Sequence, residues 1–289
     1  MYVLEVPYMN LDQIYASGQV FRWIRLRESK YVVPLRDKAL KVEQQKNRIM
    51  FDCTEDAFFE IWWNYFDLQT DYSIPFYAIR KTSDDNKIAA NRAKGIHILN
   101  QDLFEVIIAC CLGLPFSNET VEIQRQRMFE ISKRIGTKHK QAMREDGQFV
   151  WYEFPTPKKL LENIDDISDV LGKNYDLIFD LCDSIECGWF DIDLLKDLST
   201  SDAKEYLQQF GINKQKSNAI CLYGLHKLDS FPVDRCIKTI IKDNDMNLKE
   251  YYNEFISGDQ IVDDNKGILR MYLWYDKLNP PMRREDWLL

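Results

Sequence analysis

Residues 207–240 read LQQFGINKQKSNAICLYGLHKLDSFPVDRCIKTI, and this stretch decides the fold. Gly211 and Asn213 are residue types that tolerate the positive φ of a tight turn between helices. An apolar helical stripe follows the turn and is broken at Pro232, after which Asp234 can cap another helix. The stretch therefore predicts a helix, a tight turn, a helix, a short loop and a third helix.

Two interpretations of this stretch stay open at this point. It can be an ordinary helical hairpin in which Asp234 only caps a helix. Alternatively, the turn is a phosphate site, because the backbone N–H groups at a helix N-terminus attract anions. The rest of the chain has to separate the two.

The chain has 289 residues, which is enough for one large domain or two small ones with ample core. Hydrophobic residues make up 45%, as in ordinary globular proteins. The sequence contains no long apolar run, and its first residues do not resemble a signal peptide. We therefore expect a soluble cytoplasmic protein without membrane contact, associated with the nucleoid if the source is bacterial.

The seven cysteines lack a regular spacing, which argues against a disulfide framework. We expect no metal site, no iron–sulfur cluster and no cofactor. The net charge of −8 is unusual for a protein that binds nucleic acid, because phosphate contacts need basic side chains. Basic residues do gather in residues 80–94, in residues 125–144 and around the hairpin, so a basic face on an acidic body is possible.

Residues 1–75 are expected to be mainly β, with strands over 21–27, 31–35, 39–43 and 48–52, because apolar and polar residues alternate there. An aromatic-rich helical pattern covers 57–65. From about residue 80 the periodicity is helical, with an excursion over 136–152. The predicted fold is α+β: an N-terminal antiparallel sheet domain over 1–80, packed on a mainly helical domain over 81–289.

Several motifs occur in the order found in the 8-oxoguanine DNA glycosylases of the helix-hairpin-helix superfamily. Residues 17–23, SGQVFRW, are similar to that family's SGQ-x-FRW strand. Residues 95–105, GIHILNQDLFE, are similar to its GIRILRQDPFE segment, and the hairpin with FPVD at 231–234 completes the series. The resemblance spans residues 17 to 274. It implies the glycosylase fold and excision of a base that has been flipped out of DNA.

The resemblance also implies roles for individual residues. Asp234 occupies the position of the family's catalytic Asp, whose carboxylate stabilises the cationic sugar or orients water. Gln215 stands where many members carry a Lys nucleophile, and an amide cannot form a Schiff base. Either this is a monofunctional enzyme that uses water, or a catalytic Lys has been replaced by Gln.

The implied base pocket departs from the family pattern. Gly18 is retained, and in the family its carbonyl reads 8-oxoguanine. Arg270 replaces a Gln that reads the base edge, and Trp274 replaces a stacking Phe. Ala219 replaces a Cys on the opposite face, which leaves more room. Guanidinium only donates hydrogen bonds, so Arg270 changes the edge that can be read.

The DNA contacts implied by the resemblance lie on the hairpin and on a loop that is more apolar than in the family. Phe116 could serve as a wedge in the stack, or it could simply be a buried loop residue. The full set of expected DNA-binding residues is Phe116, Asn118, Gly211, Asn213, Lys214, Lys216 and Arg235.

We therefore predict a monomeric DNA glycosylase that excises a modified base from double-stranded DNA, with a specificity changed from 8-oxoguanine. A modified base in bacterial or phage DNA, and hence a role in phage defence, is one hypothesis. Three alternatives remain: an ordinary 8-oxoguanine glycosylase/lyase with Lys changed to Gln at 215, a catalytically silent module that binds damaged DNA, and a helical enzyme that does not act on nucleic acid, which the net charge of −8 favours.

Overall fold

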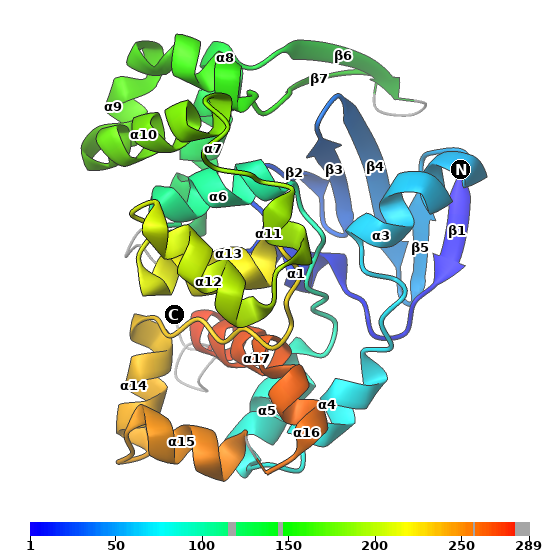
Figure 1. The fold of residues 1–289 in the computed structure, drawn as a ribbon. Coiled ribbons are helices and arrows are strands. Elements are labelled where there is room, and N and C mark those ends of the chain that lie inside the picture. Colours follow the sequence, from blue (N-terminus) through cyan, green and yellow to red (C-terminus); the bar gives the residue numbers. More distant parts are fainter. Residues whose placement is uncertain (115–119, 144–146, 257, 281–289) are drawn as a thin grey trace, which may run out of the picture.

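The computed structural model describes residues 1–114, 120–143, 147–256 and 258–280. Phe116 and Asn118 lie outside the described residues. An antiparallel sheet forms one side of the molecule and helices form the remainder, as Figure 1 shows. The predicted α+β class is confirmed. No helix among the described residues is long and apolar enough to span a membrane.

The sheet has five strands in the order β1-β5-β4-β3-β2, and every neighbouring pair is antiparallel. The strands are β1 (Tyr2–Glu5), β2 (Ile24–Arg27), β3 (Lys30–Leu35), β4 (Lys38–Gln45) and β5 (Arg48–Phe51). A continuous helical segment covers the sheet: α2 (Glu55–Ala57), the π-helical turn η1 (Phe58–Trp62) and α3 (Trp63–Tyr65). Its aromatic side chains fill the sheet's own core.

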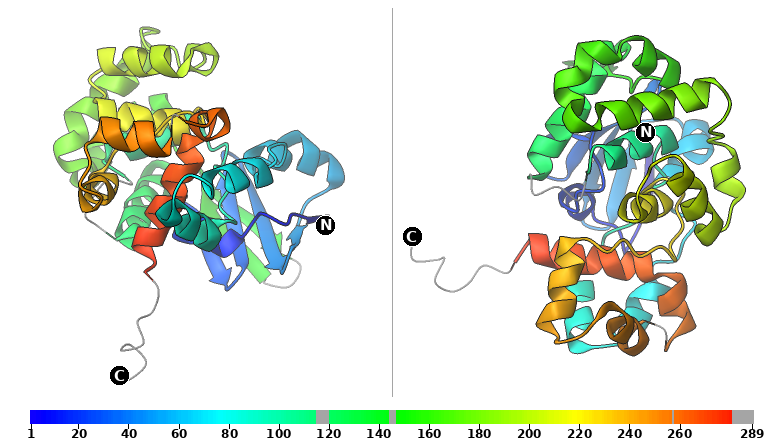
Figure 2. Two further views of the ribbon diagram at one scale, coloured as in Figure 1. Left: turned by 90° about the horizontal axis from the view of Figure 1, so that it is seen from below. Right: turned by 60° about the vertical axis from the view of Figure 1, so that its left-hand side comes forward.

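The helical part surrounds α6 (Leu103–Cys111), in which every residue except Glu105 is buried, as expected of a helix that is apolar on nearly all sides. The other helices before the hairpin are α1 (Leu11–Ala16), α4 (Ser73–Ile79), α5 (Asp84–Ala93), α7 (Val121–Ile135), α8 (Pro157–Glu162), η2 (Ile164–Ile167), α9 (Ser168–Leu171), η3 (Gly172–Asn174), α10 (Tyr175–Glu186) and α11 (Leu194–Asp197). The remaining ones are α12 (Thr200–Gln209), α13 (Lys214–Tyr223), α14 (Arg235–Asp243), α15 (Leu248–Phe255), α16 (Gln260–Asp264) and α17 (Lys266–Leu278). The last helix, α17, lies along α5, as both views in Figure 2 show.

Three features differ from the prediction. The excursion expected at 136–152 is a β-hairpin of β6 (Lys138–Met143) and β7 (Gly147–Tyr152), whereas the prediction assigned no strands to this stretch. Consecutive β-branched and aromatic residues in β7 favour a strand. The strand expected over 21–27 begins only at Ile24: Arg22 is buried as well as Phe21 and Trp23, so these three residues do not alternate between a buried and an exposed face. The short helices α1 and α4 were not predicted.

Helix α4 lies before residue 80, yet it packs against α5 and α16 rather than completing the sheet layer. Figure 1 shows α4 and α5 beside the C-terminal helices, below the sheet. The N-terminal part of the chain therefore contributes both to the sheet and to the helical layer that holds α17.

Candidate active site

The predicted hairpin is present as α12, a tight turn and α13. Gly211 has φ +77°, the left-handed conformation that glycine adopts without strain. Ile212 is fully buried beneath the turn, while Asn213 caps α13 by accepting a hydrogen bond from the backbone N–H of Lys216 at 3.0 Å. Gly211, Asn213 and Lys214 are exposed, so the turn presents the N-terminus of α13 to solvent. This is the geometry of an anion site at a helix N-terminus.

Asp234 caps α14 at the end of the loop that follows α13. Its Oδ1 accepts a hydrogen bond from the backbone N–H of Ile237 at 2.9 Å, and the residue is only 2% exposed. A buried carboxylate needs partners for its charge, and a helix N-terminus supplies one of them. The cap expected from the sequence is therefore present, and its depth gives this carboxylate a second possible role.

The second oxygen of Asp234 binds Arg270, which is fully buried. Nη2 of Arg270 donates to Oδ2 of Asp234 at 2.5 Å, and Nη1 donates to the hydroxyl of Tyr223 at 2.5 Å. The guanidinium also lies 4.8 Å from the centre of the Trp274 ring. Arg270 was expected to read a base edge. In this structure it pairs with the candidate catalytic carboxylate, a contact that sequence reasoning missed.

Gly267 explains how α17 brings Arg270 to Asp234. The backbone N–H of Gly267 donates to the carbonyl of Leu228 at 2.8 Å. A Cβ at this position would lie 2.3 Å from the side chain of Leu222 and 2.9 Å from the carbonyl oxygen of Ser230. Only glycine allows the start of α17 to lie against the loop before Asp234. Arg270 follows less than one turn later.

Asp234 and Arg270 are followed in space by Trp274 and Gly18, and we call these four residues the row. The indole Nε1 of Trp274 donates to the carbonyl of Ser17 at 3.1 Å, which fixes the ring. Gly18 is buried with φ +77°, and a Cβ there would lie 3.8 Å from that Nε1. The structure thus brings together four of the predicted residues, in the order Gly18, Trp274, Arg270 and Asp234.

One face of α13 points toward this row. Gln215, Ala219 and Tyr223 recur every four residues and so share a helical face. Tyr223 contacts Arg270, Ala219 is buried and Gln215 is half-buried. Gln215 therefore lies two turns from the residue that binds Arg270, on the same side of the helix.

The neighbouring amines and thiols do not provide an obvious nucleophile. Nζ of Lys216 donates to the backbone carbonyl of Cys111 at 2.7 Å, at the C-terminal end of α6. Burial raises the pKa of Cys236 to about 11, so this thiol in α14 is protonated at neutral pH. Lys214 and Arg235 are exposed, which suits phosphate contact better than chemistry at a buried centre.

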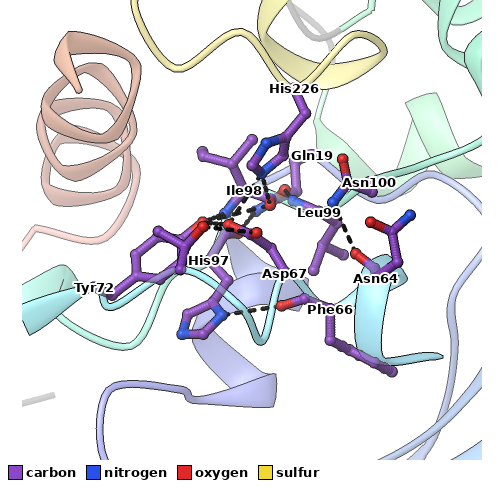
Figure 3. A network of polar contacts seen from close by, with 11 residues as sticks. Gln19, Asn64, Phe66, Asp67, Tyr72, His97, Ile98, Leu99, Asn100 and His226 are labelled. Atoms are coloured by element: carbon purple, nitrogen blue, oxygen red, sulfur yellow. Dashed lines mark hydrogen bonds and ion pairs between the residues drawn. The ribbon is translucent and has the colours of Figure 1, made fainter. Parts of the chain in front are cut away.

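A buried polar network ties the two sides of the site to each other, and Figure 3 shows it. Nε2 of His226, in the loop before Asp234, lies 3.1 Å from Oδ2 of Asp67 and 3.0 Å from the carbonyl oxygen of Ile98. Both neighbours are acceptors, so Nε2 carries the proton. The hydroxyl of Tyr72 donates to the same carboxylate oxygen at 2.8 Å. The loop is therefore anchored to the sheet side of the molecule.

The same network reaches Gly18 through the next residue, Gln19. Its amide donates to the carbonyl of His97 at 2.8 Å and accepts from the N–H of Leu99 at 3.1 Å. Burial lowers the pKa of His97 to about 4, so its ring, stacked on Tyr72, is neutral at pH 7. Sequence reasoning missed this network, because its members are dispersed over the chain and no local pattern links them.

Burial alone would raise the pKa of Asp67, but the hydrogen bonds from His226, Tyr72 and Thr70 hold it below its usual range. Asp67 is thus a fully buried charged group at neutral pH. A buried charge held by several donors rigidifies its surroundings. We conclude that the loop before Asp234 and the segment after Gly18 are fixed relative to each other.

Some basic residues expected on a DNA-facing surface have internal partners. Arg125 is largely buried, with its guanidinium 3.5 Å from the centre of the Tyr15 ring. Arg92 pairs with Asp276 on α17. These two cations support the packing around the site, so the basic runs in the sequence overstate the cationic surface.

The comparisons with known proteins concern the N-terminal domain and the fold of the whole chain. The sequence family of the 8-oxoguanine DNA glycosylase N-terminal domain matches residues 2–107. MBOgg1, solved in complex with a low-affinity DNA ligand, matches with a TM-score of 0.82 at 23% identity, over 94% of this chain and 93% of that one. The 8-oxoguanine glycosylase/lyase of Clostridium acetobutylicum in its apo form gives 0.80 at 25% identity, over 94% and 95%.

A more distant match is the 3-methyladenine DNA glycosylase from Archaeoglobus fulgidus, with a TM-score of 0.71 at 16% identity, over 98% of this chain and 100% of that one. None of the curated proteins matches the sequence significantly. The matched N-terminal domain, the whole-chain fold and the hairpin followed by a buried Asp point to one conclusion. Residues 2–107 match the N-terminal domain of the 8-oxoguanine DNA glycosylases, and the whole chain has the helix-hairpin-helix fold of the DNA N-glycosylases.

Proposed function

We propose that this protein takes a modified base out of double-stranded DNA and hydrolyses its N-glycosidic bond, with Asp234 as the catalytic carboxylate. The observation that carries the proposal is the position of Asp234. It is buried at the N-terminus of α14 and continuous with Arg270, Trp274 and Gly18. A glycosylase needs base-contacting residues beside its catalytic carboxylate, because the base has to leave the duplex and enter the protein.

The reaction consists of one exchange at the sugar. The oxygen of a water molecule bonds to C1′, and the electron pair of the C1′–N bond goes to the base. The water loses one proton and the departing base gains one. Asp234 stabilises the positive charge that develops on the sugar, and the low polarity of the buried site strengthens that stabilisation.

Water is the proposed nucleophile because of the side chains on α13. Gln215 replaces the lysine found in many members of the family, and the nearby amine of Lys216 is engaged by the carbonyl of Cys111. An ordinary 8-oxoguanine glycosylase/lyase with a changed residue 215 is the alternative within this class. In that case Gln215→Lys will create a DNA adduct that borohydride traps, and a missing adduct would contradict it.

One observation favours a second candidate, a catalytically silent module that binds damaged DNA. Both oxygens of Asp234 already have partners, and Arg270 compensates its charge. A carboxylate in this state stabilises a cation poorly. Catalysis therefore requires Arg270 to move away from Oδ2 when the base enters.

The deciding experiment is a measurement of base release by mass spectrometry from duplexes that contain 8-oxoguanine, alkylated bases or bulky modified pyrimidines. Asp234→Asn is compared with Asp243→Asn, the same change on an exposed residue at the other end of α14. We expect release by the protein and by Asp243→Asn, and loss of release with retained DNA binding for Asp234→Asn. Binding without release from any duplex would favour the silent module.

Further proposals rest on the resemblance and on the substitutions in the pocket. We propose that the protein acts as a monomer on double-stranded DNA. The replacements at 215, 219 and 270 support a base other than 8-oxoguanine, and modified bases of bacterial or phage DNA are candidates. Release of 8-oxoguanine as the preferred product would contradict the altered specificity.

A further inference from the structure

We propose that Arg270 recognises the extruded base and that the substrate carries an anionic substituent, such as a carboxylate, facing α17. This inference rests on the proposed function and names its substrate class. The anionic group would take the place of Asp234 as the partner of the guanidinium. Binding the correct base and freeing the catalytic carboxylate would then be the same event.

The first argument is the hydrogen-bond inventory of Arg270. Nη1 and Nη2 donate to Tyr223 and Asp234, but the buried Nε has no hydrogen-bond partner within the part of the chain that the structure describes. Buried donors almost always have partners, so an unused one in a site calls for an explanation. A ligand that places an acceptor at Nε would give this donor its missing partner.

The second argument concerns which ligands are compatible with a guanidinium. Arginine has only donors and stays charged at any pH that proteins tolerate. A base edge that presents N–H or NH₂ groups to it would leave donors facing donors. An edge that presents oxygens or a carboxylate pairs with two nitrogens at once, which is the geometry that guanidinium favours.

The third argument is the fixed orientation of the guanidinium. Trp274 lies against it at 4.8 Å, Tyr223 holds Nη1, and the indole of Trp274 is itself held by the carbonyl of Ser17. The unused Nε therefore points in one direction. A fixed donor discriminates between ligands more sharply than a mobile one.

The fourth argument is the charge balance with Asp234, and it distinguishes an anionic ligand from a neutral acceptor. Removing one partner from a buried ion pair leaves an uncompensated charge and is strongly unfavourable. A neutral carbonyl on the base cannot replace the charge of Asp234, whereas a carboxylate can. Only the anionic base therefore releases Oδ2 for the sugar without leaving Arg270 unpaired.

The test compares two pyrimidines of similar size. Single-turnover release is measured from duplexes that contain 5-carboxycytosine, 5-hydroxymethylcytosine or 8-oxoguanine. The proteins are the unmodified chain, Arg270→Gln, Arg270→Lys and, as a matched control, Arg36→Gln on an exposed side chain. Melting temperatures of all four show whether each variant is folded.

We expect the unmodified chain and Arg36→Gln to release 5-carboxycytosine faster than 5-hydroxymethylcytosine by about tenfold to a hundredfold, the usual worth of a good bidentate contact. Arg270→Gln should lose this preference and gain relative activity on 8-oxoguanine, because an amide both donates and accepts. Arg270→Lys should keep part of the preference, since the positive charge remains but the planar group that makes two parallel hydrogen bonds is lost.

Three outcomes would overturn the proposal in distinguishable ways. A preference for either neutral base by the unmodified chain refutes the anionic substrate and leaves the glycosylase function standing. A uniform slowing of all three substrates by Arg270→Gln, with the preference intact, makes Arg270 a structural residue. Absence of release both from these three duplexes and from the duplexes with alkylated bases and bulky pyrimidines contradicts the proposed function itself.

Discussion

Among the residues that the structure describes, two arginine–carboxylate pairs are largely buried, and they differ in how many guanidinium nitrogens have a partner. Arg22 binds Glu105 with two bonds, Nε to Oε1 at 2.7 Å and Nη2 to Oε2 at 2.6 Å, and its Nη1 donates to the carbonyl of Tyr152 at 2.8 Å. Arg270 makes a single bond to Asp234 and leaves Nε without a partner among the described residues.

The two pairs also connect different parts of the fold. Arg22 precedes the sheet strand β2, while Glu105 lies on α6 and Tyr152 on the β6–β7 hairpin, so the first pair joins three elements. The guanidinium of Arg22 has an acceptor at each of its three nitrogens, and its bidentate geometry suits a structural link between elements. The second pair lies among residues that match a catalytic pattern, and the Nε donor of Arg270 has no partner among the described residues. Burial of an ion pair alone therefore does not distinguish a structural pair from a functional one.

The largest expected effect concerns stability. Arg22→Met and Arg270→Met each leave a buried carboxylate without its cation, a change that typically costs about 3–5 kcal/mol. We expect Arg22→Met to lower the free energy of unfolding more, because it also removes the partner of the Tyr152 carbonyl. Urea unfolding measures both changes.

The double variants are the controls for this comparison. Arg22→Met with Glu105→Gln, and Arg270→Met with Asp234→Asn, remove both charges and should regain part of the lost stability. A smaller loss of unfolding free energy for Arg22→Met than for Arg270→Met, or no recovery of it in either double variant, would contradict the distinction between a structural pair and a functional one.

The next effect concerns the carboxylates in catalysis. Asp234→Asn should reduce base release by about 10²–10³-fold, the usual effect of removing an electrostatic stabiliser from an active site. Glu105→Gln should leave the rate within a few-fold, although it weakens the other pair. Single-turnover release under conditions where both variants are folded checks this. Equal losses in rate would mean that both pairs act only through the fold.

His97 sharpens the comparison, because it too has a nitrogen without a hydrogen-bond partner among the described residues, its Nε2. In this case the buried group stays neutral, since its pKa is lowered from an ordinary value of about 6.5 to about 4. Between these two pH values the unfolded chain binds a proton that the folded protein refuses. Stability therefore falls as the pH is lowered through this range, by at most about 3 kcal/mol.

Asn at this position keeps a side-chain N–H but does not titrate, so His97→Asn should flatten the pH dependence between pH 6.5 and 4.5. Urea unfolding at several pH values measures the slope. His139→Asn, on the surface hairpin, is the matched control and should keep it. Asp67 contributes in a lower range: its pKa is depressed, so its stabilisation is present above about pH 4 and is lost below that.

The smallest expected effect is at Lys216. Lys216→Met removes a cation from the C-terminal end of α6, which is worth about 0.3–1 kcal/mol, and should leave base release unchanged. Lys214→Met, one helical position from the turn on the exposed side, is the control and should affect salt-dependent DNA affinity instead. A large loss of release in Lys216→Met would assign its amine a catalytic role that the contact with Cys111 does not suggest.

Local patterns were enough for the hairpin, its Gly211 turn and the Asp234 cap, because turn and cap preferences depend on the few residues nearest in sequence. The division into sheet and helices followed from periodicity for the same reason. The β6–β7 hairpin escaped prediction. Its edge is held by a contact from Arg22, which is distant in the sequence, and periodicity carries no sign of such a contact.

The sequence by itself determined which residue types stand at the site, including Gly18, Gln215, Asp234, Arg270 and Trp274. Only the tertiary structure decided that Arg270 pairs with Asp234, and that Gly267 is the residue that makes this possible. The physical reason is that a buried charge takes whichever partner the packing brings within reach. That partner depends on how closely α17 approaches the loop before α14, and this distance is set by contacts between segments that are far apart in the chain.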